Sequence, residues 1–280
     1  MSKKSTKKKS TGLNRKIIDK YYTSLQVVQK CISFIKEHIQ INENDLCIEP
    51  SAGNGAFINE IKSIFKNYQF YDLEPDHSEI IKQDYTKLDY TNIINKYNKI
   101  HVLGNPPFGR QSSLAIKFIK KSCEYCDSIS FILPKSFKKE SLQVYFPLNF
   151  HLECEYDLPK NSFIVDNKSY DVPCIFQIWL KKEYNRDINN KQDPNKYSFV
   201  KNSEPHDISF RRVGGTAGKI DRHTKDKSTQ SHYFIKFHMP LTDELFTKLS
   251  NIEFNCKNNT TGPRSISKQE LIKEYNSIFN

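Results

Sequence analysis

The chain has 280 residues, a hydrophobic content of 37% and 43 Lys or Arg residues against 32 Asp or Glu, which gives a formal net charge of +11. This length suits one large domain, or one domain with a small addition, and the charge favours an anionic partner, most often nucleic acid. Abundant Asn and Ile leave coding bias as the alternative source of the lysines. No apolar stretch has the length of a membrane-spanning helix, and the N-terminus lacks the apolar core of a secretory signal, so we expect an intracellular protein without a membrane partner.

The N-terminal segment, residues 1–16, is rich in Lys, Ser and Thr and carries five lysines within residues 3–9. Such a segment has almost nothing to bury, so it is predicted to be a disordered basic tail. It would serve either as a nucleic-acid tether or as a targeting signal, which makes a nuclear location an alternative to a cytoplasmic one. A helical pattern then follows from Val27 to Ile35, with Thr23 or Ser24 as the N-cap.

The first glycine motif follows a short apolar strand, residues 46–48. Glu49 and Pro50 end the strand, and Gly53 and Gly55 allow a tight turn with close backbone approach before the next helix. A strand, a glycine turn and a helix in this order predict the first unit of a doubly wound sheet. The motif lacks the third glycine of a dinucleotide fingerprint and the Gly-Lys-Ser/Thr of a P-loop. An acid at the strand end favours an ammonium group over a phosphate.

A second strand is predicted over residues 68–72, and it ends in acidic residues. Asp72 lies about 20 residues beyond the glycine turn, where a carboxylate can accept both hydroxyls of a ribose. Leu73 would then pack on the face of an adenine. Asp84 follows on a predicted loop, and its alternative role is that of an exposed loop carboxylate.

The third motif is Asn105-Pro106-Pro107-Phe108, which follows the apolar strand 100–103 and Gly104. Two prolines have fixed φ and push Asn105 out of the helical region. The sequence therefore predicts a stiff turn that fixes the direction of the Asn105 amide, with Phe108 close enough to cover whatever the amide holds.

This motif resembles the catalytic motif of S-adenosylmethionine-dependent methyltransferases that act on the N6 amino group of adenine. A related Asn-Pro-Pro-Tyr motif occurs in enzymes that methylate glutamine side chains of proteins. The resemblance covers roughly residues 17–183, with the cofactor motif first. It implies S-adenosylmethionine as the cofactor and Asn105, Pro106, Pro107 and Phe108 as catalytic residues. Thr23 matches the position of a threonine at the methionine end of the cofactor, and Asp84 that of an acid at the adenine amino group. The cofactor-binding residues implied are Thr23, Glu49, Ser51, Gly53, Gly55, Phe57, Asp72, Leu73, Asp84 and Asn105.

The rest of this region predicts a helix after Ser113 and a buried strand over residues 128–134. Residues 149–158, 162–166 and 174–180 are strand-like and are predicted to form an antiparallel edge. Residues 184–197 read as a polar linker. Beyond them, a segment rich in Gly and basic residues contains Arg211, Arg212 and Lys219, which are predicted to contact nucleic acid. A strand over residues 233–237 and a C-terminal helix over 267–279 complete the prediction.

The seven cysteines indicate reduced, buried thiols. Cys123 and Cys126 have metal-ligand spacing without a matching second pair, so we expect no metal.

Together these observations predict an α/β protein with a mostly parallel, doubly wound sheet. Its parts are a basic tail (residues 1–16), a methyltransferase domain (17–183) and a small basic C-terminal region for target recognition (184–280). The expected activity is N6 methylation of adenine in DNA first and RNA second. Protein glutamine methylation and a catalytically idle nucleic-acid-binding protein are the alternatives. The oligomeric state is open.

Overall fold

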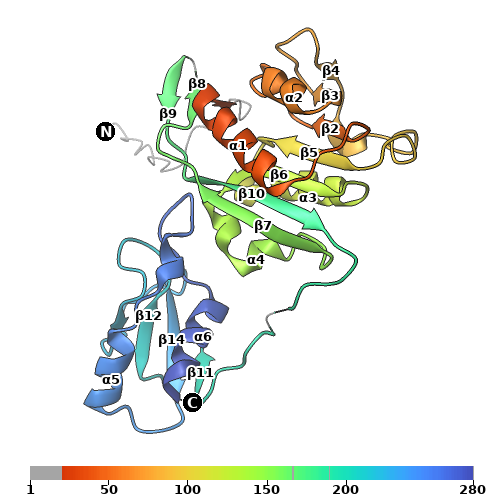
Figure 1. Ribbon diagram of the computed structural model, residues 1–280. Coiled ribbons are helices and arrows are strands. Elements are labelled where there is room, and N and C mark those ends of the chain that lie inside the picture. The colour runs from red at the N-terminus through yellow and green to blue at the C-terminus, as the bar shows by residue number, and fades with distance from the viewer. Residues whose placement is uncertain (1–20, 166, 189, 280) are drawn as a thin grey trace, which may run out of the picture.

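The computed structural model describes residues 21–279 apart from residues 166 and 189. The predicted basic tail lies outside this range. The described chain forms two lobes, which we call the N-terminal lobe (residues 21–181) and the C-terminal lobe (residues 197–279) (Figure 1).

A seven-stranded sheet forms the centre of the N-terminal lobe. Its strand order is β4 (Ile81–Lys82), β3 (Asn67–Asp72), β2 (Leu46–Glu49), β5 (Ile100–Gly104), β6 (Ser128–Pro134), β10 (Cys174–Lys181) and β7 (Phe150–Asp157). The first five strands are parallel, whereas β10 is antiparallel to both β6 and β7. This mixed, largely parallel sheet is typical of the class I methyltransferase fold, and it confirms the predicted fold class.

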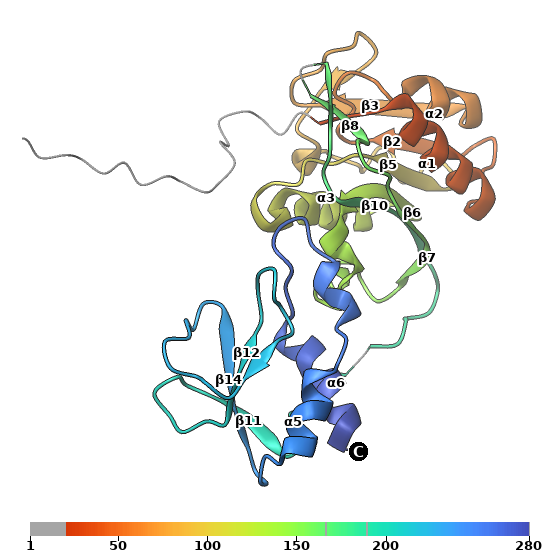
Figure 2. The same ribbon diagram turned by 90° about the vertical axis from the view of Figure 1, so that its left-hand side faces the viewer.

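Helices cover both faces of the sheet. α1 (Leu25–His38) and α2 (Ile58–Ile64) lie on one side, and α3 (Ser113–Cys123) lies on the other (Figure 2). The short α4 (Glu140–Gln143) packs through Leu142 on the same core cluster as α3. Alternation along β2 explains the two cores, because Cys47 joins the cluster under α1 and α2 while Leu46 and Ile48 join the other. Four 3₁₀ turns complete the helical elements: η1 (Tyr85–Lys87), η2 (Arg110–Ser112), η3 (Lys135–Lys138) and η4 (Asn255–Asn258).

The predicted antiparallel edge needs a correction. Residues 150–157 and 174–181 do pair, but β8 (Phe163–Val165) leaves the sheet. It pairs instead with β1 (Tyr22–Thr23) and β9 (Lys168–Tyr170) in a small sheet of its own. The central place of β10 has a physical reason, since its first six residues are all buried and require a neighbour on each side, whereas β7 alternates and suits an edge.

The C-terminal lobe is more than an appendage, because it has its own sheet and core. The strand order is β11 (Tyr197–Val200), β14 (His232–Phe237), β12 (Ile208–Arg211) and β13 (Ile220–Asp221). α5 (Asp243–Ser250) and α6 (Lys268–Phe279) accompany the sheet, and α6 buries Leu271, Tyr275 and Phe279 in the shared core. The predicted C-terminal helix therefore packs rather than frays.

The two lobes are joined by the segment between β10 and β11, which coincides with the predicted linker (Figures 1 and 2). They also touch through Lys139, whose ammonium donates to the Ser265 carbonyl at 2.8 Å and pairs with Glu270 at 3.2 Å. All seven cysteines are free, four of them buried. Within residues 21–279 as described, no helix combines the length and the apolar character that crossing a membrane requires.

Candidate active site

A cavity of about 820 Å³ opens where β2, β3 and β5 end, and it brings most of the predicted site residues together. This is the edge of a parallel sheet at which ligands bind in open α/β folds. The predicted residues that line it are Thr23, Glu49, Ser51, Gly53, Asp72, Leu73, Asp84, Asn105, Pro106, Pro107 and Phe108.

The Asn105 amide is held from one side only. Its Nδ2 donates to the Tyr21 carbonyl at 3.1 Å and to the Thr23 hydroxyl at 3.3 Å. A carbonyl can only accept, so the amide group cannot be flipped. The Ser51 hydroxyl donates to the Asn105 carbonyl at 3.0 Å and fixes the backbone of the turn. The Asn105 Oδ1 is buried and accepts no hydrogen bond from the described residues. Asn105 is one of the residues that line the cavity. It is therefore an oriented acceptor with capacity for a ligand.

Glu49 is a second buried acceptor in the same cavity. Its side chain is 2% exposed, and its Oε2 has no hydrogen-bond partner among the described residues. Burial, and next the negative charge of Asp72, raise the pKa of Glu49 to about 8. Gly104 leaves room for this side chain, since a Cβ there would lie 3.1 Å from Glu49 Cγ, and its φ of +142° suits glycine. An unpaired buried carboxylate beside a cavity suits a cationic ligand.

Asp72 ties the glycine loop to the second strand. One carboxylate oxygen accepts from the Gly53 N–H at 2.8 Å and the other from the Glu74 N–H at 2.8 Å. Gly53 has φ +53°, and a Cβ there would meet the Tyr22 ring at 3.2 Å. Asp72 and Leu73 line the same cavity, and Leu73 is 60% exposed.

Asp84 has a structural role that the sequence did not reveal. Its Oδ1 accepts from the Thr86 N–H at 3.0 Å and from the Thr86 hydroxyl at 2.7 Å, so it caps η1. These bonds, with Lys87 at 3.5 Å, lower its pKa. Its Oδ2 lies 3.5 Å from the Lys87 ammonium and keeps lone pairs for a ligand, since Asp84 also lines the cavity.

Gly55 and Phe57 do not line the cavity. Gly55 has φ +81°, and a Cβ there would clash with the Ile58 side chain at 2.7 Å. Phe57 is buried in the core cluster that also contains α1 and α2. We therefore expect Gly55 and Phe57 to support the glycine loop and not to contact a cofactor.

The lining residues that the sequence analysis did not name include two tyrosines and two cations: Tyr21, Tyr22, Arg110 and Lys117. The two tyrosines reach the cavity because β1 pairs with β8, some 140 residues further along the chain, and no local pattern indicates this pairing. Arg110 directly follows the Asn-Pro-Pro-Phe turn, and Lys117 lies on α3. They bring positive charge to a cavity whose other charged lining residues are acidic.

The basic residues predicted in the C-terminal lobe do not share one environment. Arg211 donates to the Val213 carbonyl at 2.8 Å and to the Ser231 hydroxyl at 3.2 Å. Arg212 donates to the Gln230 carbonyl at 3.1 Å and stacks over the Tyr233 ring. Lys219 is exposed and makes no ion pair with a described residue. Both arginines thus stabilise the loops around them.

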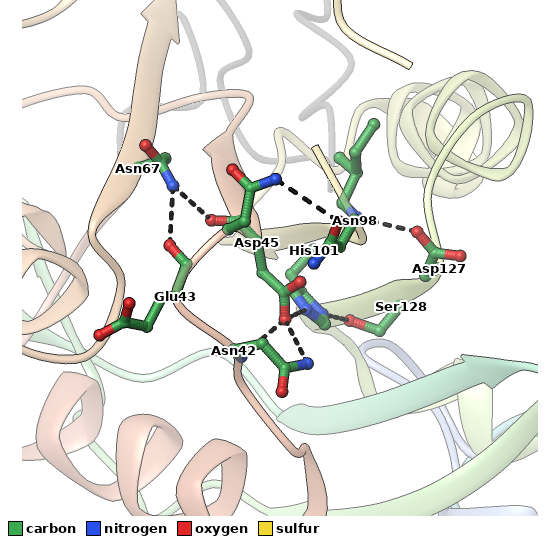
Figure 3. A network of polar contacts seen from close by, with 10 residues as sticks. Asn42, Glu43, Asp45, Asn67, Asn98, His101, Asp127 and Ser128 are labelled. Atoms are coloured by element: carbon green, nitrogen blue, oxygen red, sulfur yellow. Dashed lines mark hydrogen bonds and ion pairs between the residues drawn. The ribbon is translucent and has the colours of Figure 1, made fainter. Parts of the chain in front are cut away.

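A buried Ser–His–Asp arrangement lies at the opposite ends of the strands, where β2, β5 and β6 begin. Figure 3 shows its polar contacts. His101 Nδ1 is 2.7 Å from Ser128 Oγ, and Nε2 is 3.4 Å from Asp45 Oδ2. All three side chains are at most 4% exposed, and burial lowers the pKa of His101. A serine without access to solvent cannot attack a substrate, so this network ties the starts of β2, β5 and β6 together. The described residues contain no group of three or more His, Cys, Asp or Glu side chains able to hold a metal ion.

A scan against protein-family models finds no match. The chain is 25% identical over 209 residues to ribosomal RNA small subunit methyltransferase A of Mycoplasma mycoides. The aligned region covers 65% of this chain and 75% of the relative.

Similar solved structures include a dimethyladenosine transferase from Plasmodium falciparum and an rRNA methylase from Streptococcus thermophilus. The first has 15% identity, a TM-score of 0.42 and coverage of 58% of this chain and 63% of that one. The second has 13% identity, a TM-score of 0.39 and coverage of 56% and 96%. With TM-scores below 0.5, the fold assignment rests on the strand order of this chain.

Proposed function

We propose that this protein is an S-adenosylmethionine-dependent methyltransferase that methylates the N6 amino group of adenine in RNA. The observation that carries the proposal is the oriented Oδ1 of Asn105, which has no partner among the described residues, in a cavity that Glu49 and Asp72 also line. DNA, which the sequence alone favoured, becomes the competing substrate, because the relative at 25% identity is named for ribosomal RNA.

The residues of the cavity fit the proposed cofactor. When bound, S-adenosylmethionine supplies a methyl group on a positively charged sulfur. Glu49 Oε2 is a buried acceptor for its ammonium group, and Asp72 retains lone pairs for the two ribose hydroxyls. Leu73 offers an apolar face for the adenine ring, with Asp84 beside it. A volume of about 820 Å³ is within the usual range for ligand pockets and leaves room for a second, flat group.

Asn105 is the residue that would prepare the amino group of the target. The lone pair of an aromatic amine is delocalised, so the amine is a poor nucleophile. If Asn105 Oδ1 and the Pro106 carbonyl accept its two N–H bonds, the nitrogen is held with its lone pair directed away from both acceptors. This is catalysis by orientation and fixed dipoles, which requires no strong base. The proton lost from nitrogen after methyl transfer passes to solvent.

Phe108 completes the proposed base site. It lines the cavity and packs on the core beneath it, so its ring is supported from behind. A base stacked on such a ring gains about 1–3 kcal/mol. A paired adenine cannot reach the turn, so the substrate is an unpaired or flipped base. Phe108 in place of Tyr also disfavours the glutamine-methylating alternative.

The distribution of charge supports a separate role for the C-terminal lobe. Residues 21–183 contain 19 Lys or Arg and 20 Asp or Glu, whereas residues 184–280 contain 16 and 11. We therefore propose the division made from the sequence, with methyl transfer in residues 17–183 and target recognition in residues 184–280. The positive charge would bind phosphates outside the cavity.

The experiment that tests this function is methyl transfer from labelled S-adenosylmethionine to separate RNA, DNA and protein pools. We expect label in RNA. Label in DNA alone would change the substrate, and label in protein glutamine would refute the proposal. Asn105→Ala should abolish the transfer. Asn44→Ala serves as the matched control, because Asn44 is exposed and bonds only to Asn98.

A further inference from the structure

The C-terminal lobe has a polar pocket of about 410 Å³ that the cofactor site does not use. Strand register explains its chemistry. Arg211 on β12 lies opposite His232 on β14, and Ser209 lies opposite Asp221 on β13. Because side chains alternate along a strand, these four residues share the face opposite to Ile208 and Phe210, which fill the core. This sheet therefore has one polar face, which lines the pocket, and one apolar face, which packs on the core.

Several hydrogen-bond donors that line this pocket lack an acceptor among the described residues. Arg211 uses Nε and Nη1 to hold Val213 and Ser231, which leaves Nη2. Gly214, with φ +107°, brings the turn against this nitrogen, since a Cβ there would lie 3.2 Å away. The Ser228 carbonyl, 3.2 Å from His232 Nδ1, can only accept, so Nδ1 carries the proton of the neutral ring, and Nε2 becomes a donor only when the ring is protonated. Lys219 adds an ammonium group.

Two carboxylates also line the pocket, and only one of them is neutralised. Lys227 pairs with Asp221 at 2.7 Å, and the His223 N–H donates to the same carboxylate at 2.8 Å. Of the other charged lining residues, Arg211 and Lys219 are positive and Asp226 is negative, so the pocket carries one net positive charge. Burial, and then the neighbouring cations, lower the pKa of His232, so the ring adds no charge at pH 7. One net charge with several donors matches a singly charged anion.

We propose that this pocket binds one phosphodiester of the substrate strand and so anchors the nucleic acid away from the target adenine. The inference rests on the proposed function only in taking nucleic acid as the substrate. Arg211 Nη2 and Lys219 are the donors to the phosphate, whereas Arg212, bound to Gln230 and stacked on Tyr233, shapes the adjacent loop. A phosphomonoester, with a second charge, suits the pocket less well.

The test compares Lys219→Gln with Lys225→Gln in the full chain. Both changes remove one exposed lysine from the same region, but Lys225 does not line the pocket. Binding of a 20-nucleotide oligoadenylate is measured against salt, without S-adenosylmethionine. We expect Lys219→Gln to reduce the log–log slope by about 0.7, the value for one phosphate contact to a single strand. Lys225→Gln should leave the slope unchanged. Equal slopes for wild type and Lys219→Gln, or equal losses in both variants, would overturn the proposal.

A second readout reports on the pocket itself. A bound anion should raise the pKa of His232, which NMR of the imidazole detects. Dimethyl phosphate should produce a larger shift than inorganic phosphate, and the reverse order would overturn the diester assignment. Methyl transfer by wild type is followed in parallel. Transfer to RNA with a normal slope in Lys219→Gln would refute the pocket alone, whereas absence of oligonucleotide binding by wild type would refute the pocket and the proposed function together.

Discussion

The cavity of the N-terminal lobe and the pocket of the C-terminal lobe present opposite hydrogen-bonding groups. The cavity contains two buried acceptors, Glu49 Oε2 and Asn105 Oδ1, that have no hydrogen-bond partner among the described residues. The pocket contains donors, on Arg211 and Lys219, for which no described residue supplies an acceptor. Acceptors suit an ammonium and an amino group, whereas donors suit a phosphate. The N-terminal cavity therefore suits the cofactor and the target amine, and the C-terminal pocket suits a phosphate of the substrate.

The difference extends to charge. The acceptors lie in a part of the chain with nearly balanced charge, and the donors lie in a part with an excess of five cations over residues 184–280. Charges in a buried site are weakly screened, whereas exposed cations lose their effect as salt rises. Cofactor affinity should therefore depend little on salt, and nucleic-acid affinity should depend on it strongly. The predictions below alter one region at a time.

The largest effect is expected from removal of the oriented acceptor. Asn105→Ala should lower the single-turnover rate by at least about 100-fold, the usual cost of losing one preorganised hydrogen-bonding group. Affinity for S-adenosylmethionine should change by less than about twofold, because the buried Oδ1 is assigned to the target amine. Calorimetry gives the affinity and rapid quench gives the rate. Equal losses of both would mean that Asn105 serves the cofactor.

Asp72→Ala should weaken cofactor binding by about 1.5–3 kcal/mol, the range for hydrogen bonds to a charged group. The variant also loses the contact between the carboxylate and the Gly53 N–H, so the glycine loop should loosen. Asp89→Ala is the control, since Asp89 makes a similar local contact to Thr91 outside the cavity. An unchanged affinity in folded Asp72→Ala would remove this residue from the site.

Phe108→Ala should weaken productive base binding by about 1–3 kcal/mol, with a smaller effect on the chemical step. A mismatch opposite the target adenine lowers the cost of unpairing, so a mismatched duplex should partly rescue this variant. The same duplex should not rescue Asn105→Ala, whose defect follows base extrusion. Equal rescue of the two variants would assign both residues to a single role in binding.

The smallest effect concerns pH. The pKa of Glu49 is about 8 in the unliganded protein, and an ammonium ligand requires the ionised form. Affinity for S-adenosylmethionine should therefore rise about fivefold between pH 7 and pH 8, with proton release on binding. The unliganded protein should lose stability as pH rises from about 4.5 to about 8, because its folded state holds this proton more tightly than the unfolded state does.

Glu49→Gln should abolish both pH dependences. Calorimetry in buffers of different ionisation enthalpy measures the proton release, and thermal unfolding at each pH measures the stability. A pH-independent affinity in the wild-type protein would contradict the assignment of Glu49 to the ammonium group.

The sequence predicted the features that depend on local order. The strand before Glu49, the turn at Gly53 and the rigid Asn105 turn each follow from neighbouring residues, and their common place follows from the parallel sheet. The sequence did not predict the partners of the Asn105 amide, Tyr21 and Thr23, because they depend on the pairing of β1 with β8. It also underestimated the C-terminal lobe, whose core is assembled from short, separated apolar segments such as β12 and α6.

The most direct test of the central claim is nucleoside analysis of RNA after a single turnover by wild type and by Asn105→Ala, both saturated with S-adenosylmethionine. We expect N6-methyladenosine from the wild-type protein and at most about 1% of that yield from the variant in the same time, with both proteins fully bound to cofactor. Methylation at another position, or an undiminished yield from Asn105→Ala, would contradict this claim.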